Sequence, residues 1–466
     1  MRRSIRGSHS LPVTRGAVFW AALLVAGTLV ASLAEARVSS EQAARLGGEL
    51  TPLGAIRAGN LQGTVPSWAG GIAVPPEGYR RGMHHPDPFA ADEPLFTISA
   101  ANVDQYASQL SPGQVAMLRR YPETWRMPIY PSRRSAAYPR RIYLRTIANA
   151  TTAGLTDDGN GVAHAAEGFP FPIPQNGLEA IWNHLLRYRG LSAHRITAQA
   201  TPTAGGAYTE VRIDEKAIFA YSQPGASIQS IDNRLAYFIQ AVTAPPRLAG
   251  TIILIHETLN QKGEPRSAWT YNPGQRRVRR APNVAYDNPG TASDGQRTSD
   301  QLDMFNGAPD RYEWRLIGRK EMYIPYNNYR LHSDSLTHDQ ILEAGHIDPE
   351  YTRYELHRVW QVEATLKSGT SHIYQHRSFF LDEDSWQIVV ADHYDNRNEI
   401  WRVAEAYTIN YYENPFLWET LMCSYDLQNG RYLAFGLNNE LPIEKFDIAL
   451  DHADFTPDAI RRMGRR

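Results

Sequence analysis

Hydrophobic and polar residues alternate with a period of two over most of the chain beyond about residue 208. In 312–316, aromatic and aliphatic side chains fall on one face of the pattern and charged side chains on the other. Segment 356–366 alternates in the same way, with Trp360, Val362, Ala364 and Leu366 on one face and His357, Gln361 and Glu363 on the other. This pattern predicts strands with one apolar face and one face in water.

Runs rich in Val, Ile, Thr, Tyr and Trp, separated by turn residues, predict many such strands. We expect them at 208–213, 216–222, 234–244, 250–259, 267–271, 276–280, 311–322, 353–366, 372–381, 386–394, 399–411, 418–426 and 431–436. Connections such as 272–275 and 382–385 are too short for parallel crossovers, which need a dozen residues or more. The predicted fold class is therefore α+β and β-rich, with a large curved antiparallel sheet.

A smaller number of segments carry the helical period or helical capping residues. Ser111-Pro112 is typical of a helix start and predicts a helix over 111–120. Segment 177–189 places its apolar residues on one stripe. Further helices are expected at 99–110 and near 41–46. We expect these helices to cover the apolar face of the sheet.

The same features divide the chain into segments. Residues 37–95 are rich in Gly and Pro and predict an extended arm over the main body. Residues 96–207 are expected to form helices and loops covering the sheet, and residues 208–440 the sheet itself, as a half-barrel. Residues 441–466 are expected to be a C-terminal tail.

The N-terminus has the composition of a cleavable secretory signal. Arg2, Arg3, Arg6 and Arg15 precede an apolar stretch from Ala17 to Leu33, and Ala34-Glu35-Ala36 follows it. A basic region, an apolar core and an A-x-A site occur in signal peptides in this order. The alternative is a retained membrane anchor, for which this stretch is close to the minimum length. Cleavage after Ala36 predicts a periplasmic protein without a lipid anchor, because the first mature residue would be Arg37 and not cysteine.

Charge and cysteine content narrow the function classes. Removing residues 1–36 deletes four arginines and Glu35, which moves the formal net charge from −1 to −4. Nucleic-acid binders usually show a strong basic excess, so this balance argues against nucleic acid as a partner. Cys423 is the single cysteine in the chain and cannot form an intramolecular disulfide.

The chain contains few signs of catalysis. It has no G-x-S-x-G nucleophile elbow and no phosphate-binding G-x-x-x-x-G-K-[ST] motif. A metal-dependent enzyme remains a minor alternative, in which a site gathers from His84, His85, Asp87, His332, Asp334, His338, Asp339 and His346. Their spacing matches no specific metal site, and loop histidines with local hydrogen bonds explain them as well. We therefore predict no catalytic residues, no metal and no cofactor.

The stretch 276–280 contains Arg276, Arg277, Arg279 and Arg280. On a strand, Arg276 and Arg280 would project to one side, and Arg277 and Arg279 to the other. Charge of this kind protects the exposed edge of a sheet from unwanted pairing. It also suits contact with anionic lipid headgroups or with an acidic partner surface. The sequence leaves both interpretations open.

Four long stretches resemble a large, little-characterised family of proteobacterial periplasmic proteins related to outer-membrane lipoprotein-sorting proteins. They are LGGELTPLGAIRAGNLQGTVPSWAGG at 46–71, AWTYNPGQRRVRRAP at 268–282, TSDQLDMFNGAPDRYEWRLIGRKEMYIPYNN at 298–328 and FFLDEDSWQIVVADHYDNRNEIWRV at 379–403. The resemblance implies an unclosed β-barrel of the Lol-type carriers, wrapped over helices around an apolar cavity. This chain is much longer than such carriers, which makes a role in carrying lipoproteins doubtful.

The resemblance also implies a functional setting. Relatives are commonly encoded beside permeases of the resistance-nodulation-division (RND) type, and sometimes beside outer-membrane β-barrel proteins. We therefore expect a periplasmic carrier for a lipid or other hydrophobic molecule, with a cavity of roughly 300–1,000 Å³. The candidate cavity wall is Trp314, Leu316, Trp360, Val362, Ile388 and Val390. The alternative is an accessory subunit of a permease or outer-membrane barrel that binds no ligand of its own.

Overall fold

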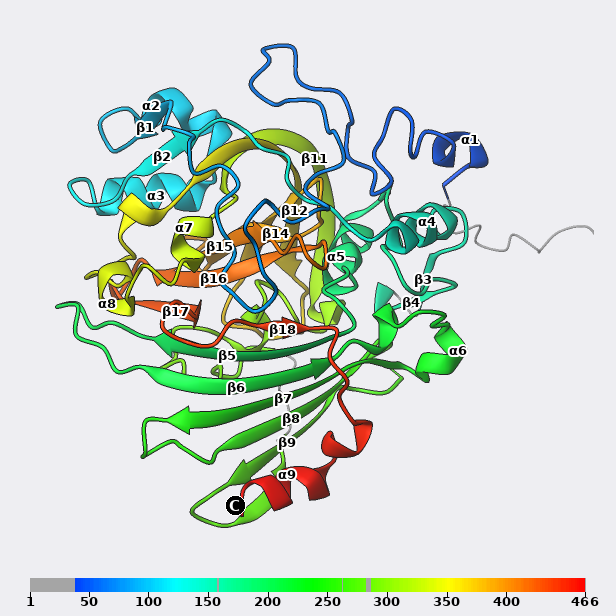
Figure 1. Cartoon of the computed structure of the whole chain (residues 1–466), viewed down its shortest axis with the longest axis vertical. Helices are drawn as coiled ribbons and strands as arrows, with labels where there is room; N and C mark the ends of the chain where they lie inside the picture. Colours follow the sequence, from blue (N-terminus) through cyan, green and yellow to red (C-terminus); the bar gives the residue numbers. More distant parts are fainter. Residues whose placement is uncertain (1–37, 157–158, 262, 282–285, 466) are drawn as a thin grey trace, which may run out of the picture. The chain divides into compact units, whose positions relative to one another are not determined.

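The computed structural model describes residues 38–156, 159–261, 263–281 and 286–465, so the predicted signal peptide lies outside the described residues. A sixteen-stranded sheet forms the framework (Figure 1). Its hydrogen-bonded order is β1-β2-β12-β13-β14-β15-β16-β17-β5-β6-β7-β8-β9-β10, with β11 paired to β12 and β18 paired to β5. The two ends of this path, β1 and β10, are not paired with each other, so the sheet is unclosed.

Two antiparallel meanders make up most of the sheet. The first contains β11 (Tyr312–Pro325), β12 (Tyr354–Leu366), β13 (His376–Asp382), β14 (Ile388–Tyr394), β15 (Ile400–Asn410), β16 (Leu417–Asp426) and β17 (Tyr432–Leu437). The second contains β5 (Ser192–Ala200), β6 (Val211–Ile218), β7 (Arg234–Ala244), β8 (Ile252–Thr258), β9 (Ser267–Asn272) and β10 (Arg277–Arg280). Pairing of β17 with β5 joins them into the β-rich, largely antiparallel fold that the sequence predicted.

The strand pattern differs from the sequence prediction at two places. Segments 208–213 and 216–222 form one strand, β6, and not two. Strand β5 lies in the segment that was expected to contain helices and loops. The sequence pattern did not predict this strand, because its inward residues Arg195, Thr197 and Gln199 are polar. These side chains are buried by neighbouring strands and not by their own hydrophobicity.

Short elements extend the sheet at its ends. They are β1 (Phe96–Ile98), β2 (Met127–Tyr130) and β18 (Lys445–Phe446), and β2 pairs with β12 in parallel. A separate hairpin joins β3 (Gly154–Thr156) to β4 (Gly161–Ala163). The parallel pair is an exception to the predicted antiparallel pattern.

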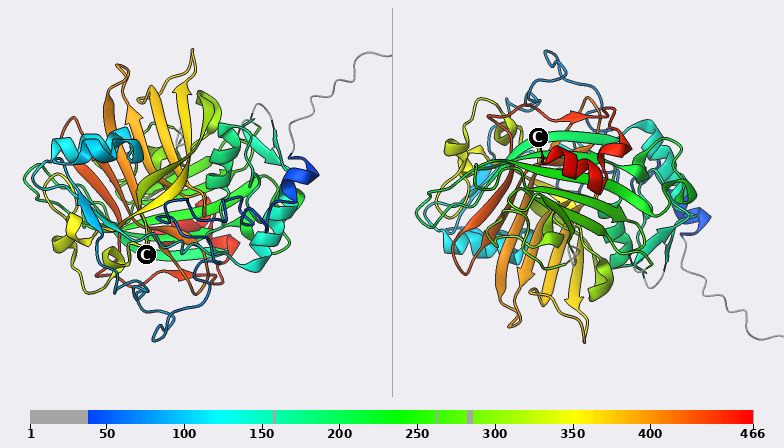
Figure 2. Two further views of the ribbon diagram at one scale, coloured as in Figure 1. Left: turned by 90° about the horizontal axis from the view of Figure 1, so that it is seen from above. Right: turned by 90° about the horizontal axis from the view of Figure 1, so that it is seen from below.

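Helix α5 (Gly177–Leu185) covers the inner face of the sheet. It contacts β11 and β12, and Ile181, Trp182 and Leu185 belong to the largest hydrophobic cluster together with residues of β5, β6 and β7. Helix α9 (Pro457–Met463), from the C-terminal segment, packs on the opposite face of β8, β9 and β10 (Figure 2). The two helices therefore cover different parts of the sheet, on opposite faces.

The remaining helices are short. They are α1 (Ser40–Ala43), α2 (Val103–Tyr106), α3 (Pro112–Arg120), α4 (Arg140–Asn149), α6 (Ile228–Ile231), α7 (Tyr329–His332) and α8 (His338–Ile341). Ser111 caps α3 through a reciprocal bond with Gln114, as Ser111-Pro112 predicted. The helix expected at 99–110 is shorter and begins after Asn102. No helix among the described residues is both long enough and apolar enough to cross a bilayer.

The prediction of one wet face is wrong for the first meander. Strand β12 is buried on both faces, and His357 and Glu363 of its polar face are buried as well. The segments before β5 cover this face: the Arg133 amide donates to Glu355 at 2.6 Å, and Ser111 Oγ donates to Asp392 on β14 at 3.0 Å. The covering segments supply polar partners, which is why the polar alternation does not mark exposure here.

Candidate functional site

A cavity of about 70 Å³ lies on the inner face of the sheet, where the second meander meets β16 and β17. Cross-strand pairs place its strand residues in rows on one face, because directly paired residues project to the same side. Ala193, Ala217 and Phe238 form one row across β5, β6 and β7. Arg195, Glu215 and Gln240 form the next row. The site therefore combines an apolar row with a charged row.

The apolar part of the lining comes from elements far apart in the sequence. It consists of Leu185, Ala193, Ala217, Phe219, Leu235, Ala236, Phe238, Leu302, Trp418 and Phe435. Helix α5 supplies Leu185, and the segment that crosses the inner face supplies Leu302. An alkyl or ring system of a ligand would lose its contact with water against these side chains.

The charged part of the lining contains both signs of charge: Arg189, Arg195 and Lys216, and Glu215, Glu257, Asp303 and Glu419. Arg195 forms an ion pair with Glu215 at 2.8 Å and stacks over the Trp418 ring at 4.2 Å. Arg189 pairs with Asp303 and lies 4.9 Å from the Phe219 ring centroid. A guanidinium held flat on an aromatic ring keeps donors free for carboxylate or phosphate oxygens.

Asp303 is the centre of a buried ion cluster beside the cavity. Its carboxylate pairs with Arg187 and Arg189 and accepts a bond from Trp418 Nε1 at 3.2 Å. Its backbone carbonyl accepts from His184 Nε2 at 2.9 Å. Burial, together with Arg187, lowers the pKa of His184 to about 3, so this imidazole is neutral.

Glu419 and Arg297 are two buried ionisable side chains beside the cavity. Burial and the nearby Asp303 raise the pKa of Glu419 well above its usual value, and its Oε2 has no hydrogen-bond partner. Arg297 lies 5.6 Å from the Phe435 ring centroid and has no ion pair among the described residues. Burial lowers the pKa of Arg297 to about 10, but the side chain remains cationic at neutral pH. An anionic group would give Arg297 the counter-charge that it lacks.

The segment 286–306 lies across the inner face, where Met304 and Phe305 join the largest hydrophobic cluster and residues 291–296 make polar contacts. Gln199 Nε2 donates to the carbonyls of Thr291 and Ala292, and Arg402 donates to the carbonyl of Gly295 at 2.8 Å. Ser424 Oγ donates to the carbonyl of Gln296 at 3.1 Å. This segment therefore covers part of the inner face at β5, β15 and β16.

The inner face continues from the cavity to the open edge of the sheet. Gln240 pairs with Ile253, Ile253 with Thr270, and Thr270 with Arg279. Ile253 and Ile255 are only partly buried. Arg277 and Arg279 therefore project to the same side, as the alternation predicted, and this side is the inner face. Strand β10 lies at the end of the hydrogen-bonded path and is an edge strand, which was one of the two interpretations left open. Arg276 does not share a strand face with Arg280, because it lies in the preceding turn with φ +52°.

The predicted cavity wall lies elsewhere, in packed core. Val362, Ile388 and Val390 have no exposed surface, which leaves them no contact with a water-sized void. Trp360 stacks on Trp386 with ring centroids 5.9 Å apart. None of the six wall residues lines the cavity described above or the polar cavity described below.

One of the six residues also lies on the wrong face. Val390 belongs to the cluster on the opposite face, because a bulge between Phe380 and Leu381 shifts the register of β13 against β14. Ile388 pairs with Leu381 on the inner face, whereas Val390 pairs with Phe380. The sequence reasoning missed the cavity residues of β5 to β7, whose charged side chains resemble those of a solvated strand.

The structure brings together part of the histidine group. His85 Nδ1 lies 2.9 Å from His332 Nε2, and His85 Nε2 lies 2.8 Å from Glu413. His332 Nδ1 contacts Thr420 Oγ1 at 2.8 Å, so both rings have their nitrogens engaged. His338 and His346 lie in other contacts, with Glu210 and Thr124. This chain of partners leaves no nitrogen of His85 or His332 available to a metal ion.

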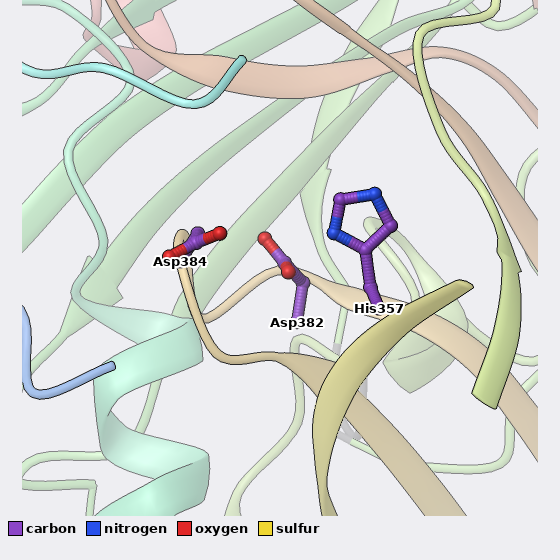
Figure 3. A group of neighbouring side chains, drawn as sticks. All are labelled: His357, Asp382 and Asp384. Atoms are coloured by element: carbon purple, nitrogen blue, oxygen red, sulfur yellow. The ribbon is translucent and has the colours of Figure 1, made fainter. Parts of the chain in front are cut away.

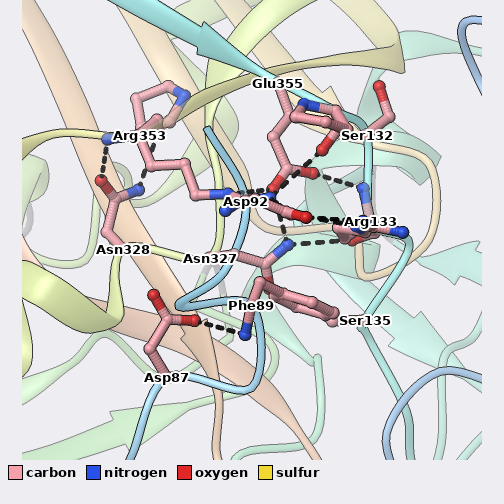
Figure 4. Close-up of polar contacts among 12 residues, drawn as sticks. Asp87, Phe89, Asp92, Ser132, Arg133, Ser135, Asn327, Asn328, Arg353 and Glu355 are labelled. Atoms are coloured by element: carbon pink, nitrogen blue, oxygen red, sulfur yellow. Dashed lines mark hydrogen bonds and ion pairs between the residues drawn. The ribbon is translucent and has the colours of Figure 1, made fainter. Parts of the chain in front are cut away.

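Asp87 lies at a second, polar cavity of about 350 Å³. Its carboxylate accepts from the Phe89 amide at 2.8 Å (Figure 4). Arg353 and Asp92 form an ion pair at 2.7 Å in the same wall. Burial raises the pKa of Asp87. This cavity has the volume of a ligand site but not the apolar lining that the sequence predicted.

Comparison with known proteins gives a consistent set of matches. Residues 97–461 match the family described as Protein of unknown function (DUF1329). An uncharacterized protein of Pseudomonas aeruginosa is 50% identical over 447 residues, which cover 95% of this chain and 98% of that protein.

Three solved structures are similar to the chain at low sequence identity. A domain described as an outer membrane lipoprotein-sorting protein domain, from Vibrio parahaemolyticus, is 13% identical, with a TM-score of 0.43 over 61% of this chain and 98% of that one. A DUF1329 family protein from Desulfovibrio piger is 14% identical, with a TM-score of 0.41 over 58% and 92%. A LolA superfamily protein from Nitrosomonas europaea is 14% identical, with a TM-score of 0.37 over 61% and 99%.

Proposed function

This chain belongs to the DUF1329 family, and from this premise we propose that it is a periplasmic carrier for a hydrophobic molecule with an anionic group. The observation that carries the proposal is the pairing of an apolar row with Arg189 and Arg195 on the inner face of the sheet. A molecule that moves between two membranes through water needs a site that removes its apolar surface from water. It also needs a group that fixes its polar end.

The charge distribution supports an anionic end. Arg189 and Arg195 lie flat against aromatic rings at the cavity, and Arg297 has no ion pair among the described residues. Burying a cation without a partner is unfavourable, so an incoming carboxylate or phosphate would be stabilised there. Arg277 and Arg279 lie on the same face at the open edge, where an anionic molecule would first meet the sheet.

The small volume of the cavity sets a further condition. At about 70 Å³ it is smaller than the usual range of roughly 300–1,000 Å³ for ligand sites. Binding therefore requires residues 291–296 to move from the inner face. Their polar contacts can be exchanged for contacts with water or ligand, whereas Met304 and Phe305 are packed in the hydrophobic cluster and would lose their burial if they moved.

Native mass spectrometry of the protein purified from periplasm tests this proposal. We expect a bound species of lipid-like mass, which solvent extraction releases and which carries an acidic group. Protein that is free of any such species, and that also fails to bind a dansylated fatty acid added in vitro, contradicts the proposal.

A substitution that fills the cavity tests whether the ligand binds there. Ala217→Leu extends a side chain into the cavity, whereas Ala241→Leu makes the same change on the opposite face of the neighbouring strand. We expect Ala217→Leu to weaken binding of the dansylated fatty acid by about tenfold or more, the effect of a lost contact of about 1.4 kcal/mol. Ala241→Leu should leave binding unchanged. Equal effects would place the ligand elsewhere.

A second candidate function is an accessory subunit of an RND-type permease or an outer-membrane barrel. The exposed Arg277, Arg279 and Arg280 on the edge strand β10 favour it, because an edge lined by cations suits an acidic partner. Charge reversal of Arg277 and Arg279 should then abolish recovery of the partner in pull-downs. Unchanged recovery removes the support for this function.

A further inference from the structure

The turn between β13 and β14 holds three carboxylates in succession, Asp382, Glu383 and Asp384. Two of them face His357 of the neighbouring strand β12 (Figure 3). One ring nitrogen of His357 and one oxygen from each of Asp382 and Asp384 lie within 4.8 Å of one another. All three side chains are buried, with exposed fractions of 1%, 0% and 5%. Mixed nitrogen and oxygen ligands at this spacing are typical of a metal site.

The hydrogen bonds of His357 determine which nitrogen is free. His357 Nε2 lies 2.9 Å from Glu355 Oε2. Glu355 also accepts from the Arg133 amide, Asn327 Nδ2 and Arg353 Nε, at 2.6, 2.9 and 2.6 Å (Figure 4). A carboxylate surrounded by donors is ionised, so Nε2 carries the proton and donates to it. The lone pair of His357 is then on Nδ1, which faces Asp382 in Figure 3.

This arrangement is the one that metal-binding histidines usually have. A ligating imidazole almost always donates its other ring N–H to a carboxylate or carbonyl, which fixes the tautomer and the ring orientation. Glu355 performs this function for His357. Tyr326 stacks on the imidazole with ring centroids 4.0 Å apart and holds its plane. The ring is therefore preorganised with a free nitrogen toward two carboxylates.

Asp382, which faces the free nitrogen of His357, has a carboxylate oxygen without a hydrogen-bond partner. Its Oδ2 accepts from Ser385 Oγ at 2.5 Å and from the Tyr326 hydroxyl at 3.4 Å. Its Oδ1 is buried and has no hydrogen-bond partner. A buried carboxylate oxygen without a partner is destabilising, and native proteins rarely contain one without a water or ion.

Arg134 fixes the position of Asp384, the third proposed ligand. Arg134 forms two bonds to Asp384, from Nε to Oδ2 and from Nη2 to Oδ1, both at 2.7 Å. Glu383 instead pairs with Arg319 at 3.4 Å and with Arg358 and Arg134 at 3.5 Å. Each proposed ligand thus has an outer partner, and Glu383 shares Arg134 with Asp384.

We propose that His357, Asp382 and Asp384 bind a divalent transition-metal ion, with Zn²⁺ as the best match, through one imidazole nitrogen and two carboxylate oxygens. Imidazole disfavours the hard cations Mg²⁺ and Ca²⁺, which prefer all-oxygen sites. Water would complete the coordination. Because the three ligands are buried, the role is structural and not catalytic.

The position of the site indicates what the ion would stabilise. The turn that carries Asp382 and Asp384 also contacts the N-terminal arm: the Ile56 amide donates to Glu383 at 3.2 Å, and Trp386 donates to the Leu53 carbonyl at 3.0 Å. An ion bridging β12 and this turn would fix the surface on which the arm rests. The inference is independent of the carrier function, because no ligand residue lines the cavity at Arg195.

A refolding experiment tests the site, because a buried ion is acquired during folding. Protein made from the full-length chain is unfolded in guanidinium with a chelator, and refolded with or without Zn²⁺. We expect about one equivalent of zinc after dialysis, by elemental analysis, and a higher Tm than for metal-free protein. Zinc far below one equivalent, with the same Tm in both samples, overturns the proposal.

Two substitutions identify the ligands. Asp382→Asn keeps the size of the side chain and should abolish both zinc retention and the Tm shift. Asp392→Asn is the matched control, since Asp392 is a buried carboxylate on β14 that lies outside the set and should retain zinc. Retention of zinc by Asp382→Asn overturns the proposal.

If Asp382→Asn fails to fold, the absorption spectrum of the Co²⁺-substituted protein provides a second test of the ligands. His357→Gln in Co²⁺-substituted protein should lose the visible d–d absorption that a nitrogen and oxygen site produces, while Asp392→Asn keeps it. An unchanged spectrum in His357→Gln would place the ion elsewhere and overturn the assignment.

Discussion

The guanidinium carbon of Arg195 lies 4.2 Å from the centroid of the Trp418 ring, and the same guanidinium pairs with Glu215 at 2.8 Å. Strand β5 thus holds a buried cation between an aromatic face and a carboxylate. Burial on this scale makes Arg195 a structural residue as well as a candidate ligand contact. The two roles can be separated by experiment.

Arg195→Met should lower the free energy of unfolding by about 3–5 kcal/mol, because Glu215 is left as a buried charge without its ion pair. The double variant Arg195→Met, Glu215→Gln should recover most of that loss. Chemical denaturation measures both values. Arg45→Met is the control, since the Arg45–Glu49 pair is exposed and should change stability by less than about 1 kcal/mol. Equal losses in the single and double variants would contradict this account.

Asp392 should make stability fall as the pH rises. Its carboxylate accepts from the Gly113 amide at 2.9 Å and from Ser111 Oγ at 3.0 Å. Burial, with Glu363 and Glu405 nearby, raises its pKa from 3.8 to about 7. The native state therefore holds this proton more tightly than the unfolded chain. The resulting stabilisation is present below about pH 4 and is lost as the pH rises through 7.

The comparison with Asp392→Asn isolates this effect, because Asn cannot titrate. Between pH 4 and pH 8, the stability of the natural protein should fall relative to the variant by about 4 kcal/mol. Denaturation curves at several pH values measure the difference. Lys320 also faces this carboxylate, and burial lowers the pKa of its ammonium group. A constant difference between the two proteins would show that Asp392 does not titrate there.

Gly54 should tolerate no side chain where the arm meets the body. Its φ is +89°, and an added Cβ would lie 1.7 Å from the Pro172 carbonyl oxygen. Gly47 has a similar φ of +82° but no atom within 4 Å of an added Cβ. Gly47→Ala should therefore cost about 1–2 kcal/mol from backbone strain alone. Gly54→Ala should cost at least about 2 kcal/mol more, by chemical denaturation, and similar losses would mean that the arm moves away without penalty.

Arg279 should speed the capture of an anionic ligand. It shares the inner face with Thr270, whereas Arg280 pairs with Trp269 on the other face. In stopped-flow measurements with a dansylated fatty acid, Arg279→Gln should slow association severalfold at low salt and much less at high salt. Arg280→Gln should have the smaller effect. The opposite ranking would contradict entry along the inner face.

Sequence patterns predicted the regular parts of this protein well. The limits of β7 agree with the prediction over 234–244, and Ser111 caps α3 as expected. Both features depend on local chemistry, namely alternation along one strand and a side chain bonding its own backbone nearby. Strand β5 was missed because its inward Arg195, Thr197 and Gln199 are buried by distant partners.

The residues of the candidate sites were harder to predict from the sequence than the strands, because their positions depend on contacts between distant segments. Val390 looks like a wall residue from alternation alone, but a bulge in the β13–β14 pairing places it on the opposite face. His357 looks like a solvent-facing residue of β12, yet it is buried against Asp382 and Glu355. A bulge arises from the pairing of two strands, and burial by a covering segment arises from contact between two segments. The pattern of hydrophobic and polar residues in one strand therefore cannot predict either.

The sequence by itself determined the family, the β-rich antiparallel class and the arginines of the edge strand, because periodicity, turn length and long motifs are written in consecutive residues. Only the tertiary structure decided that segment 286–306 lies on the inner face, that Arg195 faces Trp418, and that His357 of β12 meets Asp382 and Asp384 at the turn after β13. The physical reason is that burial and unsatisfied polar atoms arise when segments far apart in the chain come into contact.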